Sequence, residues 1–382
     1  MVKPRVCIIS HVYLEERYQG KLNYLAQHVD LTVISPDAFQ SAYRMQRAVF
    51  PRERVYDIRT YSVFYPLGIR TSTRWMLASM DLGFRESPPN IIHVENEAHS
   101  FSLLQALIYR RLYTPQARIV LSFWANQKIS GLKGAFLDLL TWVMRPDISF
   151  YIAGSTDGMK LLVEDRISPK RVVTFPLDGV DMNYYSPALE GELPKIRTKL
   201  SFSFDEFVIG FVGRFVLEKG ICDLLAAFQK LRERVVGRRV RLLCVGDGPL
   251  KSMLLYQPEV VVASPGNASG VLDYYRIMDV LVLPSRTTPM WKEQFGRVLS
   301  EAMAVGIPVI GSSSGAIPEV IGDAGVIFNE GDVHALEQQL LAILSNPEIS
   351  HELRRRGQRR VANNYSDRCI AEKTLAVYGS LL

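Results

Sequence analysis

Four charged residues in the second half of the chain lie where an apolar segment gives way to a turn or a helix. Arg214 and Lys219 belong to GRFVLEKG, and Glu293 and Glu301 are eight residues apart in KEQFGRVLSEAMA. A guanidinium fork and a nearby ammonium suit the oxygens of a diphosphate. The helix predicted to begin around residue 295 would add its unpaired amides, which also attract an anion. The four residues therefore predict a phosphate-binding site.

The two carboxylates predict what surrounds that phosphate. Glu293 lies just before the helix and could accept hydrogen bonds from sugar hydroxyls. Glu301 lies more than one turn into the helix and could accept hydrogen bonds from the paired hydroxyls of a ribose. A ligand with a phosphate and two polyol ends is a nucleotide sugar. Each charged residue taken singly also fits an exposed turn or a surface helix, so the prediction rests on the set.

The elements that must position these residues follow an alternating pattern. Near-continuous Val/Ile/Leu runs alternate with helix-periodic segments, which is typical of parallel sheets covered on both faces. The pattern predicts strands in the first half at 5–11, 30–36, 90–95, 118–124, 148–154 and 171–177, with helices at 22–29, 102–113, 135–144 and 156–164. It restarts with strands at 207–215, 240–248, 259–265, 280–285, 308–313 and 324–328, and helices at 221–235, 249–256, 270–279 and 295–304. Two doubly wound α/β domains follow, with ligands expected beyond the carboxyl ends of the strands.

The domain boundary is predicted where this alternation stops. Turn residues and prolines break the pattern in DGVDMNYYSPALEGELPK, and we place the boundary near Tyr185. An N-terminal domain is expected over residues 1–185 and a C-terminal domain over 186–365, followed by the end of an amphipathic helical tail over 366–382.

The composition is that of a globular protein. The 382 residues are 48% hydrophobic and 22% charged, and no apolar run reaches the roughly 18 residues of a membrane-spanning helix. The N-terminal MVKPRVCIISHVY reads as a first strand rather than a signal peptide. The four cysteines lack the spacing of a metal site and predict free thiols in a reducing compartment. We expect a cytoplasmic protein with no metal and no cofactor.

The net charge of +6 is concentrated in the first half, where residues 1–185 hold 22 Lys+Arg against 17 Asp+Glu. Much of the excess comes from one stretch that also carries aromatic residues, namely Arg44, Arg47, Arg52, Arg54 and Arg59 with Tyr43, Phe50 and Tyr56. Such a stretch is typical of contact with an anionic partner, either a membrane surface or a ligand. An ordinary solvated face is the alternative interpretation. No nucleic-acid partner is expected, because no binding motif accompanies the charge.

At this point the motifs resemble a known family. GRFVLEKG paired with TPMWKEQFGRVLSEAMAVGIPVIGSSSGAIPEVIGDAG resembles the retaining glycosyltransferases of family 4, whose E-x7-E motif matches Glu293 and Glu301. The segment FPLDGVDMNYYSP resembles the linker phrase that ends the acceptor domain in that family. The resemblance implies the GT-B fold, with two Rossmann-like domains facing a central cleft. It also implies an N-terminal domain that binds the acceptor, a C-terminal domain that binds the nucleotide sugar, and a last helix, 366–382, that crosses back.

The resemblance also assigns roles to residues. Arg214 and Lys219 would bind the donor diphosphate, with Gly213 letting the chain leave its strand close to the ligand. Glu293 would hold the transferred sugar and Glu301 the ribose. Further donor contacts, largely through the backbone, would come from Gln294, Phe295, Gly296 and Val298.

The first half departs from the family pattern in two places. The paired glycines expected after the first strand are represented by Gly20 alone, and the histidine expected after strand 118–124 is replaced by Trp124 and Asn126. The candidates for contact with the acceptor are therefore His11, Glu97 and Asn126, while His93 reads as a structural residue of a strand.

The implied reaction transfers a sugar from a UDP-sugar, with UDP-glucose preferred, to a hydroxyl of an oligosaccharide or lipid-linked acceptor in polysaccharide biosynthesis. The anomeric configuration would be retained, and Glu293 would position the sugar. No metal is implied, since the D-x-D triplet of the other major glycosyltransferase fold is absent. Two alternatives stay open, a GT-B sugar-nucleotide epimerase and a non-catalytic nucleotide-sugar-binding protein. A dehydrogenase is not supported, because no G-x-G-x-x-G opens either domain.

Overall fold

The computed structural model describes residues 2–40, 45–47, 55–65, 75–78, 82–264 and 270–382. The chain divides into two compact units. Unit 1 comprises Met1–Gly179 together with Asp367–Leu382, and unit 2 comprises Val180–Ser366. Within the predicted basic stretch, Tyr43, Arg44, Phe50, Arg52 and Arg54 lie outside the described residues. The predicted domain boundary near Tyr185 stays a prediction.

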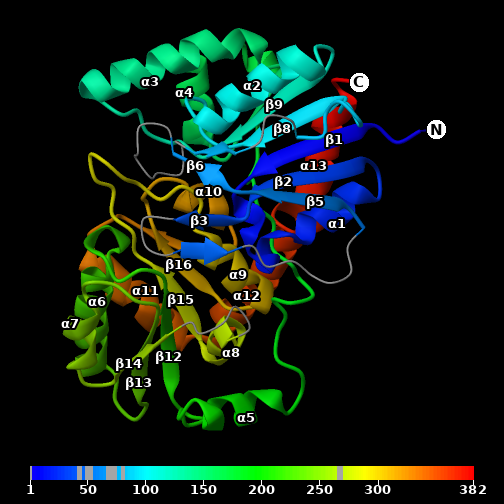
Figure 1. Ribbon diagram of the computed structural model, residues 1–382. Coiled ribbons are helices and arrows are strands. Elements are labelled where there is room, and N and C mark those ends of the chain that lie inside the picture. The colour runs from blue at the N-terminus through cyan, green and yellow to red at the C-terminus, as the bar shows by residue number, and fades with distance from the viewer. Residues whose placement is uncertain (1, 41–44, 48–54, 66–74, 79–81, 265–269) are drawn as a thin grey trace. The chain divides into compact units, whose positions relative to one another are not determined.

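Unit 1 is built on a seven-stranded parallel sheet in the order β11-β10-β9-β8-β1-β2-β5 (Figure 1). Its strands are β1 (Arg5–Ser10), β2 (Asp30–Pro36), β5 (Asp57–Tyr61), β8 (Ile91–Glu95), β9 (Arg118–Phe123), β10 (Phe150–Ala153) and β11 (Val172–Thr174). The central strand β1 pairs through Val6 with Leu31 of β2 and with Ile91 of β8. Because the chain continues to one side of β1 through β2 and to the other through β8, the order reverses between β1 and β8.

The two faces of this sheet carry different helices, which follows from the alternation of side chains along β1. Val6 and Ile8 pack in a core with residues of α1 (Gly20–Ala26) and α13 (Asp367–Gly379). Cys7 and Ile9 pack in a second core with residues of α2 (Phe101–Tyr113), α3 (Gly131–Met144) and α4 (Thr156–Glu164). The last helix of the chain is therefore part of unit 1.

Unit 2 is built on a six-stranded parallel sheet in the order β14-β13-β12-β15-β16-β17. Its strands are β12 (Phe207–Val212), β13 (Val240–Val245), β14 (Val260–Ala263), β15 (Val280–Leu283), β16 (Val309–Ser312) and β17 (Val326–Phe328). The helices are α5 (Glu192–Lys199), α6 (Ile221–Arg234), α7 (Lys251–Leu255), α8 (Gly270–Ile277), α9 (Arg297–Val305), α10 (Ile317–Ile321), α11 (Val333–Ser345) and α12 (Pro347–Asn364). Here the strand order reverses between β12 and β15, which is where doubly wound sheets bind ligands.

The predicted fold class, two doubly wound α/β units with parallel sheets, is confirmed. The pattern did not predict the strand β5, the helices α5, α10 and α11, or the small antiparallel pairs β3 (Ala38–Gln40) with β4 (Met45–Arg47) and β6 (Val63–Phe64) with β7 (Met76–Leu77). Short 3₁₀ turns occur at η1 (Val12–Leu14), η2 (Glu16–Tyr18), η4 (Arg145–Asp147), η5 (Pro169–Arg171) and η6 (Leu217–Lys219). Across the described ranges, every helix is too short or too polar to cross a bilayer.

Candidate functional site

The loop after β12 carries the two predicted phosphate-binding cations. Gly213 and Arg214 follow the strand directly, and Lys219 ends the turn η6. Gly220 then caps α6 in the left-handed conformation, with φ of 67°. A Cβ on Gly220 would lie 1.8 Å from the carbonyl oxygen of Pro284, so this turn is packed directly against the segment that follows β15. The loops after β12 and β15 therefore meet at the point where the strand order reverses.

Lys219 and Glu293 form an ion pair at this point. The Lys219 Nζ lies 2.6 Å from Oε2 of Glu293, and the Ser285 hydroxyl donates to the same oxygen at 2.8 Å. The Lys219 ammonium also lies 4.8 Å from the centre of the Trp291 ring. Glu293 is only 6% exposed. Its carboxylate is held in place by Lys219 and Ser285, which come from two neighbouring loops.

The backbone of Glu293 is fixed by the loop after β16. The amide of Ala316 donates to the Glu293 carbonyl at 3.0 Å. Gly315 adopts φ of 54°, and a Cβ there would lie 2.1 Å from the same carbonyl oxygen. A residue with a side chain at 315 would displace Glu293, so the glycine of SSSGA is required by close approach.

Helix α9 begins at Arg297 and not at 295 or 296 as predicted, because Gly296 is in the left-handed conformation with φ of 77°. Glu301 lies one turn inside the helix and is 5% exposed. Its Oε2 accepts from the Tyr275 hydroxyl at 2.7 Å, and its Oε1 from Tyr185 at 3.1 Å and from Arg297 at 2.9 Å. Burial, with the Glu301 charge beside it, keeps the pKa of Tyr275 well above its ordinary range, so that hydroxyl stays a donor.

The remaining predicted donor contacts differ in accessibility. Gln294 is exposed and Val298 half-buried, whereas Phe295 is buried edge-on against Tyr365, with 5.6 Å between ring centres. Arg214 is partly exposed and lies 4.0 Å from Glu218. Phe295 could therefore reach a ligand only through its backbone.

In unit 1, the strand reversal between β1 and β8 holds a buried charge cluster that the sequence did not reveal. Lys21 Nζ donates to Glu95 at 2.8 Å and to the Leu177 carbonyl at 2.6 Å, and the Tyr13 hydroxyl donates to Glu95 at 2.9 Å. Burial acts to raise the pKa of Glu95, but Lys21, His93 and the hydrogen bonds outweigh it, so the net pKa is lowered. The cluster joins β8, α1 and the end of unit 1.

Two of the three predicted acceptor-side residues lie close to each other. The Glu97 carboxylate, beyond β8, accepts from the amide of Ala125 at 3.2 Å, next to the buried Asn126 beyond β9. Burial raises the pKa of Glu97 to about 7. His11, beyond β1, packs edge-on against Trp75, and burial lowers its pKa to about 4, so its ring is neutral at physiological pH.

His93 lies inside the sheet. Its two ring nitrogens bond to Tyr378 at 2.7 Å and to Ser122 at 2.6 Å. Burial lowers the pKa of His93 to about 4 as well, so the neutral ring links β8, β9 and α13.

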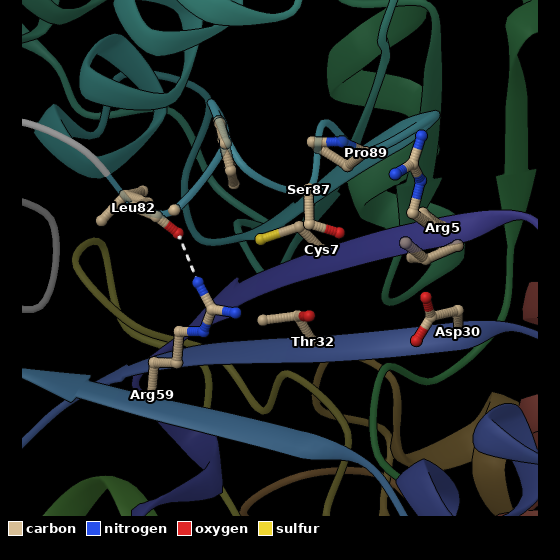
Figure 2. Close-up of a pocket in the computed structure, with 11 residues that line it drawn as sticks. Arg5, Cys7, Asp30, Thr32, Arg59, Leu82, Ser87 and Pro89 are labelled. Atoms are coloured by element: carbon tan, nitrogen blue, oxygen red, sulfur yellow. Dashed lines mark hydrogen bonds between the residues drawn. The ribbon is translucent and has the colours of Figure 1, made fainter.

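A small hollow in unit 1 lies beside the first residues of β1 and β2, where Arg5, Cys7, Asp30 and Thr32 line it (Figure 2). Its volume is only about 20 Å³, enough for a water molecule. Arg59 donates to the Leu82 carbonyl at 3.2 Å across one side, and burial raises the pKa of Cys7 far above its ordinary value. The thiol is therefore inert, and the hollow is no substrate site.

Several residues of the unit 2 site were not predicted from the sequence: Tyr185, Tyr275, Ser285, Trp291 and Arg297. They come from separate elements, and only the fold brings them to the two glutamates. The signals available were weak, namely the position of Ser285 directly after a strand, as in VLVLPS, and the tyrosine pair in NYYSP.

Comparison with known proteins gives concordant results. The sequence profile of the family described as "Glycosyl transferases group 1" matches residues 193–360. A protein of Bacillus subtilis named "Putative teichuronic acid biosynthesis glycosyltransferase TuaC" is 34% identical over 316 residues, which cover 77% of this chain and 75% of that protein. CapM of Staphylococcus aureus, a capsular polysaccharide biosynthesis glycosyltransferase, is 31% identical over 47% of each chain. The chain thus spans about half the length of the first curated relatives it matches, 47% and 56%.

Solved structures are similar in fold. The crystal structure of Anabaena HepE in complex with UDP superposes with a TM-score of 0.74 over 98% of this chain and all of that one, at 15% identity. A glycosyltransferase from Rickettsia africae gives a TM-score of 0.73 over 99% of this chain at 16% identity. At such identities the likeness concerns the fold alone.

Proposed function

This chain belongs to the glycosyl transferases group 1 family, and from that premise we propose that it transfers a sugar from a nucleotide diphosphate sugar to an acceptor hydroxyl with retention of configuration. The observation that carries the proposal is the arrangement at the β12/β15 strand reversal. There Lys219 and Ser285 hold the Glu293 carboxylate, and Arg214 follows the same strand as Lys219.

The first step of the proposed reaction is departure of the nucleotide diphosphate. The bond from the anomeric carbon to the diphosphate oxygen breaks, and negative charge builds up on the leaving phosphate. Arg214, Lys219 and the first amides of α9 supply fixed positive potential for that charge, which is the largest contribution in many sites of this kind. This stabilisation needs no metal.

The second step is attack by the acceptor on the same face of the sugar. The acceptor oxygen bonds to the anomeric carbon, and its proton passes to an oxygen of the departing phosphate. Glu293 orients the sugar through its hydroxyls, which makes it a positioning residue and not a nucleophile. Glu301 takes the ribose through Oε2, which accepts from Tyr275 and keeps further acceptor capacity, whereas Oε1 already accepts from Tyr185 and Arg297.

UDP-glucose is the donor we favour, and a growing glycan, free or lipid-linked, is the acceptor. HepE, similar in fold, has been solved with UDP-glucose, and the relatives CapM and TuaC are named for polysaccharide and teichuronic acid biosynthesis. These relatives support a glycan acceptor. Unit 1 is the proposed acceptor-binding part, with His11, Glu97 and Asn126 as its contacts.

The test is a donor panel. Purified protein in EDTA is incubated with UDP-, GDP- and ADP-sugars, with and without glycan acceptors, and free nucleotide and products are measured. We expect turnover of a UDP-sugar that falls about 100-fold in Glu293→Gln. Turnover should be unchanged in the exposed Glu233→Gln on α6, which is the matched control.

Three outcomes would contradict the proposal. Conversion of the donor to its epimer without any acceptor would indicate an epimerase. Donor binding with neither transfer nor hydrolysis across the acceptor panel would indicate a binding protein. Rescue of Glu293→Ala by azide, with a glycosyl azide of inverted configuration as the product, would show that Glu293 is a nucleophile and overturn its positioning role.

A further inference from the structure

Helix α3 of unit 1 carries large apolar side chains on its exposed face as well as on its buried face. Gly134, Leu137 and Met144 face the core. The opposite face carries five large apolar side chains that are 50% to 94% exposed. Leu132, Phe136, Leu139 and Val143 are spaced by three or four residues and so form one stripe along the helix, and Trp142 lies beside it. An ordinary surface helix would present polar residues there.

This face needs a partner. A contiguous exposed apolar surface of this kind marks a site of contact with a protein or a membrane. Leu132 is 94% exposed, so the end of the stripe stands free of neighbouring side chains. A stripe on a single projecting helix suits a deformable partner, because lipid can surround each side chain without a matching groove. Trp and Phe on the apolar face are also typical of helices that lie in a membrane interface.

The charge of the molecule favours an anionic partner. Unit 1 holds 24 Lys+Arg and 18 Asp+Glu, whereas unit 2 holds 21 of each, so the whole net charge of +6 lies on the unit that bears α3. Lys133 lies on the helix and Arg145 follows it, where Arg145 donates to the Asp165 carbonyl, while Lys128 before the helix is ion-paired with Asp165 and Glu164. Asp138 is the one acidic residue of the helix itself. Lys133 is exposed and forms no ion pair within the described part of the chain.

We propose that α3 docks unit 1 on an anionic phospholipid bilayer. The five apolar side chains enter the boundary between headgroups and acyl chains, and the exposed Lys133 contacts the lipid phosphates. The docking does not depend on the sugar-transfer reaction, and it gives a structural basis for membrane contact that does not require the basic stretch around residues 44–59.

The test is co-sedimentation with vesicles, without nucleotide or acceptor. Vesicles of phosphatidylcholine alone are compared with vesicles that contain 30–40% phosphatidylglycerol, on the order of the anionic content used to mimic charged membranes. We expect the protein to bind the anionic vesicles and to be released by high salt. The double variant Leu132→Glu/Leu139→Glu should bind at least about tenfold more weakly, because apolar burial is lost and two negative charges are added.

Two exposed apolar residues of unit 2, Val236 and Phe204, provide the matched control. Val236→Glu/Phe204→Glu adds the same charges at similar exposure and should bind the anionic vesicles like the wild-type protein. A blue shift of fluorescence on vesicle addition, lost in Trp142→Phe, would place the helix in the lipid. Circular dichroism and donor turnover of the α3 variant should match the wild-type values, so that loss of docking is separated from loss of fold or activity.

Equal vesicle binding by the α3 variant and the wild-type protein would overturn the proposal. So would wild-type protein that binds no vesicles yet self-associates in analytical ultracentrifugation through the same face, since the partner would then be a second copy of the chain. Binding of soluble glycans through Trp142, with no vesicle binding, would also contradict it.

Discussion

At the scale of single residues, the Lys219–Glu293 pair is the feature on which the unit 2 site depends. Both side chains are largely buried, and the pair joins the loop after β12 to the segment before α9. A buried charge is tolerated mainly because its partner is present, so removal of one partner leaves an uncompensated charge. The same pair therefore contributes to stability and to the geometry of the candidate site.

We predict that Lys219→Met lowers the free energy of unfolding by roughly 3 kcal/mol. The double variant Lys219→Met/Glu293→Gln should recover part of that loss, because it leaves no unpaired charge. Urea denaturation of the wild-type protein, the two single variants and the double variant measures both the loss and its recovery. The control is Lys199→Met, which breaks an exposed pair with Asp273 and should cost less than about 1 kcal/mol. Equal losses in the two lysine variants would show that the buried pair has no special role.

Glu97 gives a prediction about pH. Because burial raises its pKa from 4.5 to about 7 in the folded protein, the folded state holds the proton more tightly than the unfolded state. The stabilisation from this group is complete below pH 4.5 and is lost as the pH rises through 7. The stability of the wild-type protein relative to Glu97→Gln should therefore fall by about 3 kcal/mol between pH 4.5 and 8.

Thermal or urea unfolding at several pH values measures that difference. The exposed Gln116→Asn in the same unit removes no titratable group, so it should give a difference that is flat with pH. A flat curve for Glu97→Gln as well would mean that the Glu97 carboxyl is ionised normally.

The residue types of the unit 2 site were predictable, but their partners were not. GRFVLEKG and the two glutamates carry enough spacing information to predict a phosphate site with a sugar on either side. Ser285, Tyr275 and Tyr185 are ordinary residues in the sequence, and only the strand order brings them to Glu293 and Glu301. Long-range contacts of this kind leave no local pattern.

At the scale of elements, glycines set how closely the loops of unit 2 approach each other. Gly220 is the clearest case, because its left-handed backbone and the Pro284 carbonyl both exclude a side chain. Strands were predictable because buried parallel strands are continuous apolar runs. The strand β5, DIRTY, was missed because it lies at the edge of the sheet and is polar. The start of α9 was misplaced because glycine at 296 allows a conformation that the pattern cannot reveal.

We predict that Gly220→Ala destabilises the protein by roughly 3 kcal/mol or more, since it adds a backbone clash to the strain of a positive φ. Gly237→Ala is the matched control. Gly237 has φ of 79° but nothing within 4 Å of its would-be Cβ, so only the backbone strain of about 1 kcal/mol should appear. Chemical denaturation measures both variants. A Gly220 variant as stable as the Gly237 variant would contradict the close packing of the β12 and β15 loops.

At the scale of the whole molecule, the chain ends in the unit where it began. Helix α13 contributes Ile370, Ala371, Val377 and Tyr378 to the core of unit 1, against α1 and β1. The helical periodicity of the tail could be predicted from the sequence. Its destination could not, because an amphipathic helix fits any apolar surface, and the expectation that it crosses back came from the family resemblance alone.

We predict that Tyr378→Ala destabilises unit 1 by about 3–5 kcal/mol, since a large side chain that is 1% exposed is removed from the core. Tyr378→Phe keeps the ring and loses the bond to His93, so it should cost about 1 kcal/mol. Hydrogen exchange locates the effect. Protection should fall in β1, β8 and α1 and stay unchanged in β12 and β15. Loss of protection in unit 2 instead would show that α13 supports the other unit.

The central claim is that the strand reversal in unit 2 binds the diphosphate of a nucleotide, and calorimetric titration with UDP tests it most directly. We expect the wild-type protein to bind UDP in EDTA and Arg214→Ala to bind it roughly 10- to 100-fold more weakly, because a charge-assisted contact with phosphate is lost. Lys230→Ala removes an exposed cation near the far end of α6 and should leave the affinity unchanged. Failure of the wild-type protein to bind UDP or any other nucleoside diphosphate, or equal affinities in the two variants, would contradict the claim.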